Sequence, residues 1–352
     1  MTSETMPSRA RPRPLTRFGR AWVLKTVFGR EGLGRLLAVA ALGLMSCVPA
    51  QAASQTVRVV EYTETSHPWA TWQCARLPVQ VRQLGRNLEV MVRGESRWLI
   101  PARSASGARF VVPGDDTTEF WGKGPRARLT WSGQALPECT EPGAITLPFR
   151  ASGNEPFWAV HYDGWRLLLS RLGHADYEVD AVVVQQESVV DALQGNGPFG
   201  PVRVALREQL CTDSMSGLVR PYAVTVSFQE AVLYGCGGDA ARLLQGARWD
   251  VRTADGSPLS ASAWLEFLPN GQLRGQAGCN RLTGHYRVTG EGIQLGGLAA
   301  TRKACPAPVA EQEAALLAVL PEVRGFSFDE DGKLVMHAYP DQQVILQMHA
   351  GQ

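Results

Sequence analysis

Six cysteines that fall two by two into three consecutive stretches constrain this 352-residue chain more than any other feature. A seventh, Cys47, lies in an N-terminal segment that we expect to be acylated or removed, so an even number remains. In an oxidising compartment an even set of cysteines indicates disulfides. Of the pairings open to them, we favour the one that keeps each bridge inside one of the modules inferred below: Cys74–Cys139, Cys211–Cys236 and Cys279–Cys305. Each bridge would stabilise its module by about 3–4 kcal/mol.

Residues 1–46 carry the pattern of a secretory signal. Lysines and arginines precede the apolar run Leu36–Met45, which is too short to span a bilayer. Two processing routes stay open. Leu44-Met-Ser-Cys47 resembles the bacterial lipobox, which implies a lipoprotein acylated at Cys47, with palmitate among its chains. Ala50-Gln-Ala52 resembles the site of ordinary signal peptidase, which implies a soluble periplasmic product.

We favour the lipoprotein, and Val48 after the cysteine predicts a periplasm-facing position at the outer membrane. Removal of residues 1–46 also changes the sign of the charge. That segment carries eight Lys/Arg against two Glu, a net +6, whereas the whole chain carries +2, so −4 remains for the rest. The composition therefore argues against nucleic-acid binding, which needs a basic face.

Short alternating segments separated by Gly, Pro and Asn/Asp predict a mainly β chain of three small modules. We expect a β-barrel-like domain at residues 57–141, a β-rich domain at 142–240 and an α+β domain with one helix at 241–350. The first strand is predicted at Val57–Tyr62. The helix is predicted at Val309–Leu320, which is rich in Ala, Glu and Leu and precedes Pro321.

Two hairpins are predicted from their turn residues. Asp163-Gly164 separates two apolar runs in the middle module and predicts a type I′ turn. Asn270-Gly271 predicts a second hairpin in the last module.

Two motifs in the first module carry a family resemblance. Ser104-Ala-Ser-Gly-Ala-Arg-Phe110 is followed by Phe120-Trp-Gly-Lys-Gly124, and Cys74 and Cys139 bracket both. In this order they resemble the membrane-bound inhibitors of c-type lysozyme. The resemblance implies a protein partner, c-type lysozyme, and an inhibitory pair at Ser106 and Lys123.

The chemistry of that pair is understandable from its target. A c-type lysozyme cleaves a glycosidic bond with two carboxyl groups. A lysine ammonium brings three donors and a full charge to a carboxylate, and a serine hydroxyl beside it can donate or accept. The neighbouring glycines, Gly107, Gly122 and Gly124, let the backbone turn tightly and present both side chains at loop tips.

Two departures from the family pattern stand out. The family usually has Tyr where Phe110 stands, and Gly114-Asp-Asp116 lengthens the hairpin between the motifs. Asp115, Asp116 and Glu119 add negative charge that either weakens the attraction of Lys123 for a carboxylate or engages the basic rim of a cationic lysozyme.

The later modules resemble other envelope families. Gly153-Asn-Glu-Pro-Phe-Trp158, Met215-Ser-Gly217 and Gly235-Cys-Gly-Gly238 resemble a bacterial envelope family of unknown function, in which Asn154 and Glu155 form either a polar site or a plain turn. Gly275-Gln-Ala-Gly-Cys-Asn-Arg281 and Leu298–Cys305 resemble the META domain of heat-inducible lipoproteins. Asn280 and Arg281 are there either ligand-binding residues or, more often for such residues, partners of backbone groups.

The sequence contains no pattern typical of catalysis or of a metal site. No His-Glu-x-x-His or Gly-x-Ser-x-Gly occurs, and we expect neither enzyme activity, metal nor cofactor. Gly195-Asn-Gly-Pro-Phe-Gly200 fits the dinucleotide-binding expression, but a strand rather than a helix is predicted after it.

Two functions compete on these grounds. The first is a lipid-anchored inhibitor of c-type lysozyme. The second is a non-inhibitory envelope-stress lipoprotein whose later modules bind a wall component or a partner protein. An exposed Lys123 favours the first, and a Lys123 held by Asp115, Asp116 or Glu119 favours the second.

Overall fold

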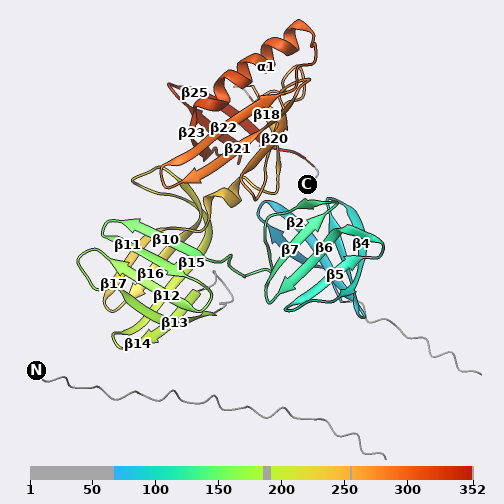
Figure 1. The fold of residues 1–352 in the computed structure, drawn as a ribbon. Coiled ribbons are helices and arrows are strands. Elements are labelled where there is room, and N and C mark those ends of the chain that lie inside the picture. Colours follow the sequence, from blue (N-terminus) through green and yellow to red (C-terminus); the bar gives the residue numbers. More distant parts are fainter. Residues whose placement is uncertain (1–66, 185–191, 254–255, 351–352) are drawn as a thin grey trace, which may run out of the picture. The chain divides into compact units, whose positions relative to one another are not determined.

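The computed structural model describes residues 67–184, 192–253 and 256–350, which form three separate antiparallel sheets (Figure 1). The expectation of a mainly β chain with one α-helix is confirmed for these residues. The signal, Cys47 and the strand predicted at Val57–Tyr62 lie outside them. Within the described ranges, no helix is long and apolar enough to cross a membrane.

The first sheet has the order β6-β5-β4-β3-β2-β1-β9-β7-β8, and an additional pairing of β6 with β7 closes it on itself. Its strands are β1 (Ala70–Cys74), β2 (Leu77–Leu84), β3 (Asn87–Val92), β4 (Glu95–Ala102), β5 (Ala108–Val112), β6 (Asp115–Lys123), β7 (Arg126–Trp131), β8 (Gln134–Ala135) and β9 (Cys139–Thr140).

Alternation along these strands puts one face of the sheet into the core. In β2, Leu77, Val79 and Val81 are buried and the residues between them are not. Trp72 and Phe120 meet edge to face in the same core. A disulfide joins Cys74 to Cys139, which pair directly across β1 and β9, and both cysteines are fully buried. This bridge holds β9 in the position where β9 also pairs with β7.

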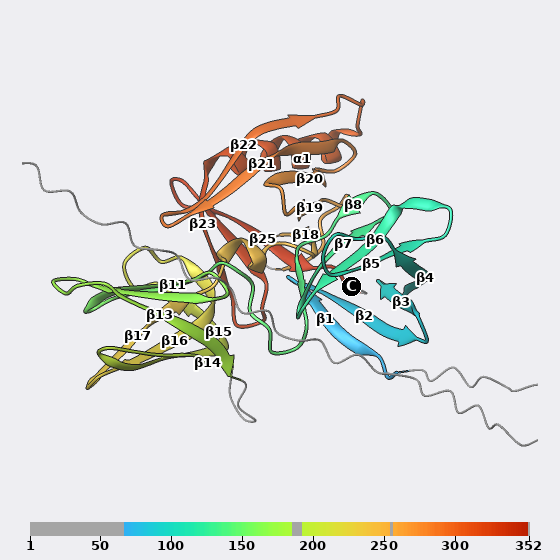
Figure 2. The same ribbon diagram turned by 60° about the horizontal axis from the view of Figure 1, so that its bottom comes forward.

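The second sheet is a closed barrel of eight strands in chain order (Figure 2). They are β10 (Phe149–Asn154), β11 (Phe157–Tyr162), β12 (Arg166–Arg171), β13 (Tyr177–Val184), β14 (Ala192–Gly197), β15 (Gly200–Thr212), β16 (Val219–Phe228) and β17 (Ala231–Gly237). Trp158, Leu167, Leu169, Val204 and Val226 contribute to its core. The barrel carries the disulfide Cys211–Cys236. Residues 195–200 form the β14–β15 hairpin, so a strand does follow the glycine-rich expression.

The hairpin predicted at Asp163-Gly164 is present, but the prediction of a type I′ turn is wrong. Type I′ needs positive φ at both central residues, and only Gly164 has it (φ 108°). The loop is wider, because the Asp163 carboxylate accepts hydrogen bonds from the backbone N–H of Trp165 (2.8 Å) and Arg166 (2.7 Å). These bonds also lower the pKa of Asp163 below its usual value.

The third sheet has the order β22-β21-β20-β19-β18-β25-β24-β23. A short 3₁₀ turn, η1 (Ala240–Leu243), precedes it. Its strands are β18 (Arg248–Arg252), β19 (Trp264–Phe267), β20 (Gln272–Gln276), β21 (Arg281–Thr289), β22 (Gly292–Ala300), β23 (Val323–Phe328), β24 (Leu334–Ala338) and β25 (Gln342–Met348).

The helix α1 spans Ala307–Val319 and passes into a 3₁₀ turn, η2 (Leu320–Glu322). The α-helix ends at Val319, one residue before the predicted end. Leu320, which precedes Pro321, keeps helical geometry (φ −55°, ψ −40°), so the proline does not break the chain there but lies inside the 3₁₀ turn. Leu316 and Leu320 anchor it in the core. The disulfide Cys279–Cys305 joins the β20–β21 connection to the segment that leads into the helix.

The role of the first disulfide can be tested by replacing Cys74 and Cys139 together with alanine. We expect the first module to lose about 4 kcal/mol of unfolding free energy, because the bridge closes a loop of 65 residues. Amide hydrogen exchange in β1 and β7 should accelerate. The matched variant, with Cys211 and Cys236 replaced, should leave those amides unchanged, and equal acceleration in both variants would contradict the assignment.

Candidate functional site

The two inhibitor-like motifs meet at one end of the β5–β6–β7 strands, which lie side by side in both ribbon views (Figure 1, Figure 2). Ala108 pairs with Gly122 across β5 and β6, and Lys123 pairs with Arg126 across β6 and β7. Ser106, two residues before Ala108, therefore lies at the same end of the ladder as Lys123. The register brings together residues that are 17 positions apart in sequence.

Glycine is required at the point where the two motifs touch. Gly107 has φ +68°, and a Cβ there would lie 2.3 Å from the carbonyl oxygen of Gly122. Any side chain at 107 would push the strands apart. Gly124 has φ +61° in the two-residue turn to Arg126, which suits the first central position of a type II′ turn. Gly107 thus has a packing role and Gly124 a turn role. The expectation of a tight turn at Gly122 is wrong, because this residue lies within β6 and pairs with Ala108 and Ala127.

The backbone of Ser106 is held by two neighbours. Its carbonyl oxygen accepts hydrogen bonds from the Trp121 indole Nε1 (2.8 Å) and from the Ser104 hydroxyl. Its backbone N–H donates to Ser104 Oγ (3.3 Å). Ser106 is exposed, and within the described ranges no residue is hydrogen-bonded to its hydroxyl. Ser104 and Trp121 belong to the two sequence motifs, but their positioning role depends on strand pairing and is not evident from the motifs alone.

Lys123 is exposed at the tip of the β6–β7 hairpin. Its ammonium forms no ion pair or hydrogen bond with any residue that the structure describes. This is the arrangement expected of a side chain available to a partner, and it differs from the alternative in which Asp115, Asp116 or Glu119 engages the lysine.

Two of those three carboxylates, Glu119 and Asp115, pair with arginines. Glu119 accepts two hydrogen bonds from Arg109, at 3.0 and 2.7 Å, and this contact raises the pKa of Arg109. Asp115 is bound by Thr117 and lies 3.5 Å from Arg97, and these contacts, the Thr117 hydrogen bonds first, lower the pKa of Asp115. Asp116 is exposed. Asp115 and Glu119 are therefore paired with arginines rather than with Lys123.

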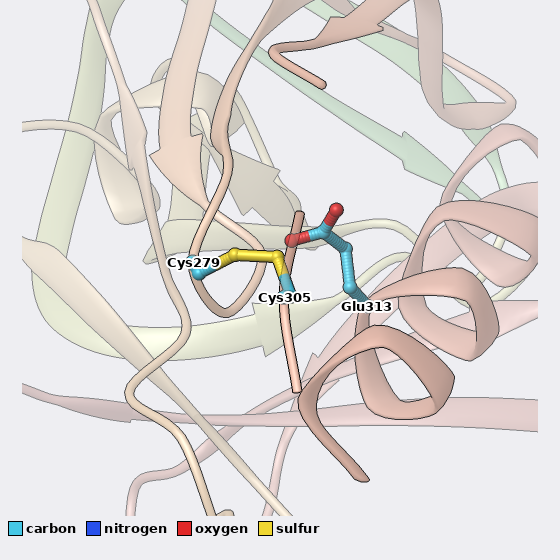
Figure 3. A group of neighbouring side chains, drawn as sticks. All are labelled: Cys279, Cys305 and Glu313. Atoms are coloured by element: carbon cyan, nitrogen blue, oxygen red, sulfur yellow. A yellow bond between two sulfur atoms is a disulfide. The ribbon is translucent and has the colours of Figure 1, made fainter. Parts of the chain in front are cut away.

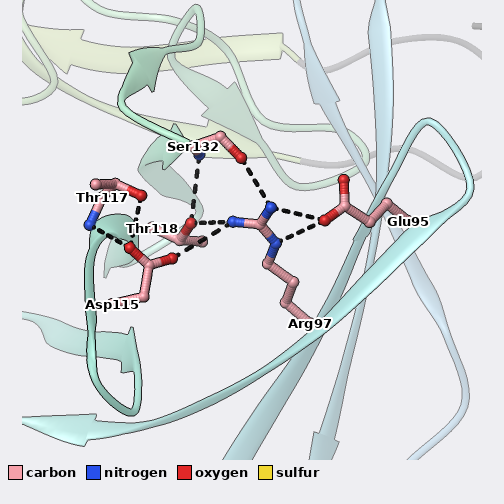
Figure 4. Close-up of polar contacts among 6 residues, drawn as sticks. All are labelled: Glu95, Arg97, Asp115, Thr117, Thr118 and Ser132. Carbon is pink, nitrogen blue, oxygen red and sulfur yellow. Dashed lines mark hydrogen bonds and ion pairs between the residues drawn. The ribbon is translucent and has the colours of Figure 1, made fainter.

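Arg97, which pairs with Asp115, also contacts several other residues (Figure 4). Its guanidinium contacts Glu95 on its own strand β4, the buried hydroxyl of Thr118 on β6 and Ser132 after β7. It also lies over the Trp131 ring, 4.6 Å from the centroid. One side chain thus links three strands of the barrel and fixes the start of β6.

A hollow of about 290 Å³ lies beside the motif end of β6 and β7. It is lined by Ser106, Trp121, Lys123, Arg126, Ala127, Arg128 and Glu138. Arg126 lies 3.6 Å from Glu138. Three cations against one carboxylate leave a local excess of positive charge, which attracts an incoming carboxylate.

Phe110 lies away from this hollow. It pairs with Phe120 across β5 and β6 and packs against the core of the module. The missing tyrosine hydroxyl therefore belongs to a core-facing position rather than to the surface that carries Ser106 and Lys123.

In the last module, Asn280 forms hydrogen bonds with other groups of the protein. It is 3% exposed, its side-chain oxygen accepts hydrogen bonds from Thr301 Oγ1 and Lys303 N–H (2.8 Å each), and its amide nitrogen donates to Glu313 Oε1 (2.7 Å). These contacts fit the interpretation in which Asn280 is a partner of the protein's own groups rather than a ligand-binding residue. The Arg281 side chain is exposed.

Cys279, Cys305 and Glu313 cluster beside Asn280, with one potential ligand atom from each lying within 4.8 Å of the others (Figure 3). A soft metal needs thiolates, but here the two sulfur atoms are bonded to each other. The Glu313 carboxylate accepts hydrogen bonds from the backbone N–H and the side-chain amide of Asn280. The cluster therefore connects the helix to the loop that the disulfide closes.

Comparisons with known proteins agree with two of the three resemblances. Residues 72–137 match the family model "Membrane-bound lysozyme-inhibitor of c-type lysozyme", and residues 242–351 match the META domain. None of the curated proteins compared with the chain matches it. A solved structure, an NMR structure of a protein from Burkholderia xenovorans, is 24% identical and covers 35% of this chain and 95% of its own, with a TM-score of 0.27.

The approach of Gly107 to Gly122 predicts a difference between two glycine variants of the same hairpin. Gly114→Ala places a Cβ at φ +75° in open space, so it should cost about 1 kcal/mol from backbone strain alone. Gly107→Ala adds a clash with the Gly122 carbonyl and should cost clearly more. The Trp121 indole N–H signal in NMR should also shift in Gly107→Ala only. Equal destabilisation by the two variants would contradict the close approach.

Proposed function

We propose that this protein is an envelope lipoprotein that binds and inhibits c-type lysozyme by placing Ser106 and Lys123 between the catalytic carboxylates of the enzyme. The observation that carries the proposal is the exposed ammonium of Lys123, which has no ion-pair partner in the described part of the chain and lines the same hollow as Ser106, where positive charge is in excess. The family match of residues 72–137 supports lysozyme as the partner.

The chemistry of the pair suits that target. The active site of c-type lysozyme contains one carboxyl of raised pKa and one that stays ionised. An ammonium can make charge-assisted hydrogen bonds to the ionised group. The neighbouring hydroxyl can accept from the protonated group or donate to the ionised one. Together they would fill the space in which the glycosidic bond of the substrate lies during cleavage.

Preorganisation supports the same role. A loop that must be ordered on binding loses affinity in proportion to the freedom it gives up. Here the carbonyl of Ser106 is already held by Trp121 and Ser104, and the Lys123 turn is fixed by strand pairing. Little backbone order would have to be gained when the two tips enter a cleft.

The pairing of the acidic residues favours inhibition over the second candidate function. An envelope-stress module without inhibitory activity would be consistent with a Lys123 bound to its own carboxylates. The contacts of Arg97 and Arg109 with Asp115 and Glu119 support the opposite arrangement. The META match supports an envelope-stress role for the last module alongside inhibition.

We further propose that the protein acts as a binding protein rather than an enzyme, and that acylation at Cys47 tethers it to the periplasmic face of the outer membrane. The several acyl chains of a bacterial lipoprotein hold it firmly, whereas one chain binds a bilayer only marginally. Cleavage after Ala52 would instead release a soluble periplasmic inhibitor. The inhibitory surface is the same in both forms.

Titration of the purified protein into a c-type lysozyme tests the proposal. We expect inhibition at micromolar concentrations or below. Lys123→Ala should weaken it about 100-fold, because removing one partner of a charge pair buried at an interface leaves the other charge unpaired and costs about 2–5 kcal/mol. Ser106→Ala should weaken it about tenfold. Lys303→Ala removes the same charge from an exposed position in the last module and should change nothing.

Two results would contradict the proposal. One is the absence of inhibition by the unmodified protein at micromolar levels. The other is a Lys123→Ala variant that inhibits as strongly as the Lys303→Ala control. Unchanged amide exchange in β6 and β7 would show in each case that the variants are folded.

A further inference from the structure

A second groove, of about 570 Å³, lies on the outer wall of the middle barrel. Its floor comes from four neighbouring strands in register. Thr225 pairs with both Ala205 and Tyr234, and one step along the strands Ala223 pairs with Arg207 and Cys236. These residues alternate with the buried Val204, Val224 and Leu233, so they face away from the barrel core. The small side chains of Ala205, Ala223 and Thr225 leave the groove open.

The other wall of the groove is a built structure. After a bulge, β15 continues to Cys211, whose disulfide with Cys236 fastens this extension to β17. The turn that follows begins at Asp213 and is tied to the β10–β11 turn, because Asn154 Nδ2 donates to Asp213 Oδ2 (3.3 Å) and to Ser214 Oγ (2.9 Å). Two separate links therefore keep the extension in place.

Sequence motifs of the middle module converge on this wall. Asp213 Oδ1 accepts from the N–H groups of Met215 and Ser216, which shapes the Met-Ser-Gly turn. Burial opposes ionisation of Asp213, but the bonds from Ser216, Met215 and Asn154 outweigh it and lower its pKa. Trp158 is buried in the core, whereas Asn154 and Glu155 line the groove. Their position is consistent with the interpretation of Asn154 and Glu155 as parts of a polar site.

The chemistry of the groove suits a neutral polyhydroxyl ligand. Tyr234 lines the groove and is 71% exposed. Glu155 offers acceptors, Arg207 offers donors, and the Thr225 hydroxyl can do both. Asn154 offers its side-chain oxygen as an acceptor, because its amide nitrogen already donates to Asp213 and Ser214. The Asp213 carboxylate is bonded to neutral groups of the protein and keeps its charge, so with Glu155 it gives the lining two carboxylates against the guanidinium of Arg207. This small excess of negative charge disfavours an anionic ligand.

We propose that this groove binds a short neutral oligosaccharide, with the apolar face of one sugar ring on Tyr234 and its hydroxyls on Glu155, Asn154 and Arg207. The volume lies in the range of small-molecule sites, about 300–1,000 Å³. An aromatic ring beside a few polar groups matches the alternation of C–H faces and hydroxyl edges on a pyranose. The site is distinct from the Ser106–Lys123 surface and does not depend on lysozyme inhibition.

Calorimetric titration of the purified protein with chitotetraose and with cellotetraose tests the inference. At least one of them should bind, and Tyr234→Ala should weaken that binding about tenfold or more. Glu155→Gln is a second, independent variant and should weaken it severalfold. Trp165→Ala removes an equally exposed aromatic residue from the same barrel, outside the groove, and should leave binding unchanged.

The location of binding is checked by amide chemical shifts. Residues 152–155, 211–214 and 234–236 should shift on titration. The inference is overturned if neither tetrasaccharide binds at millimolar concentration, if binding is as strong in Tyr234→Ala as in Trp165→Ala, or if inorganic phosphate displaces the sugar.

Discussion

The contact between Gly107 and Gly122 is the constraint on which the proposed inhibitory surface depends. It lets β5 approach β6 so closely that the Ser106 carbonyl reaches the Trp121 indole, and the same register sets Lys123 beside the hollow. The Cys74–Cys139 bridge supports this end of the barrel from the other side, since β9 pairs with β7 at Ala127 and Arg126. A surface formed in this way is rigid before it meets a partner.

Charge placement is the second requirement. A lysine close to added acidic residues can form an ion pair with one of them. Its attraction for a carboxylate of a partner protein would then be weaker. Arg97 and Arg109 prevent this by occupying Asp115 and Glu119. Exposed ion pairs contribute little stability, so their importance here lies in which charges they remove from the surface. The aspartates that lengthen the hairpin are therefore compatible with an inhibitory Lys123.

Much of the fold followed from local pattern, and much of the site did not. Alternating strands and the helix before Pro321 were predictable because each depends on residues close in sequence. The Trp121–Ser106 bond and the capture of Asp115 by Arg97 depend on strand register, which a single sequence does not specify. The prediction of a type I′ turn at Asp163 was wrong for a related reason. Hydrogen bonds of the aspartate side chain, rather than the backbone preference of Asp-Gly, determine the shape of this turn. In the middle module the motif residues were visible, but the groove they line exists only once the barrel closes.

A crystal structure of the complex with a c-type lysozyme would show whether Lys123 lies between the two catalytic carboxylates of the enzyme, as we propose. We expect Lys123 Nζ within hydrogen-bond distance of one catalytic carboxylate and Ser106 Oγ within hydrogen-bond distance of the other, with the Trp121–Ser106 hydrogen bond intact. A complex in which the β6–β7 tip lies outside the cleft, or in which another module occupies the cleft, would contradict the proposal.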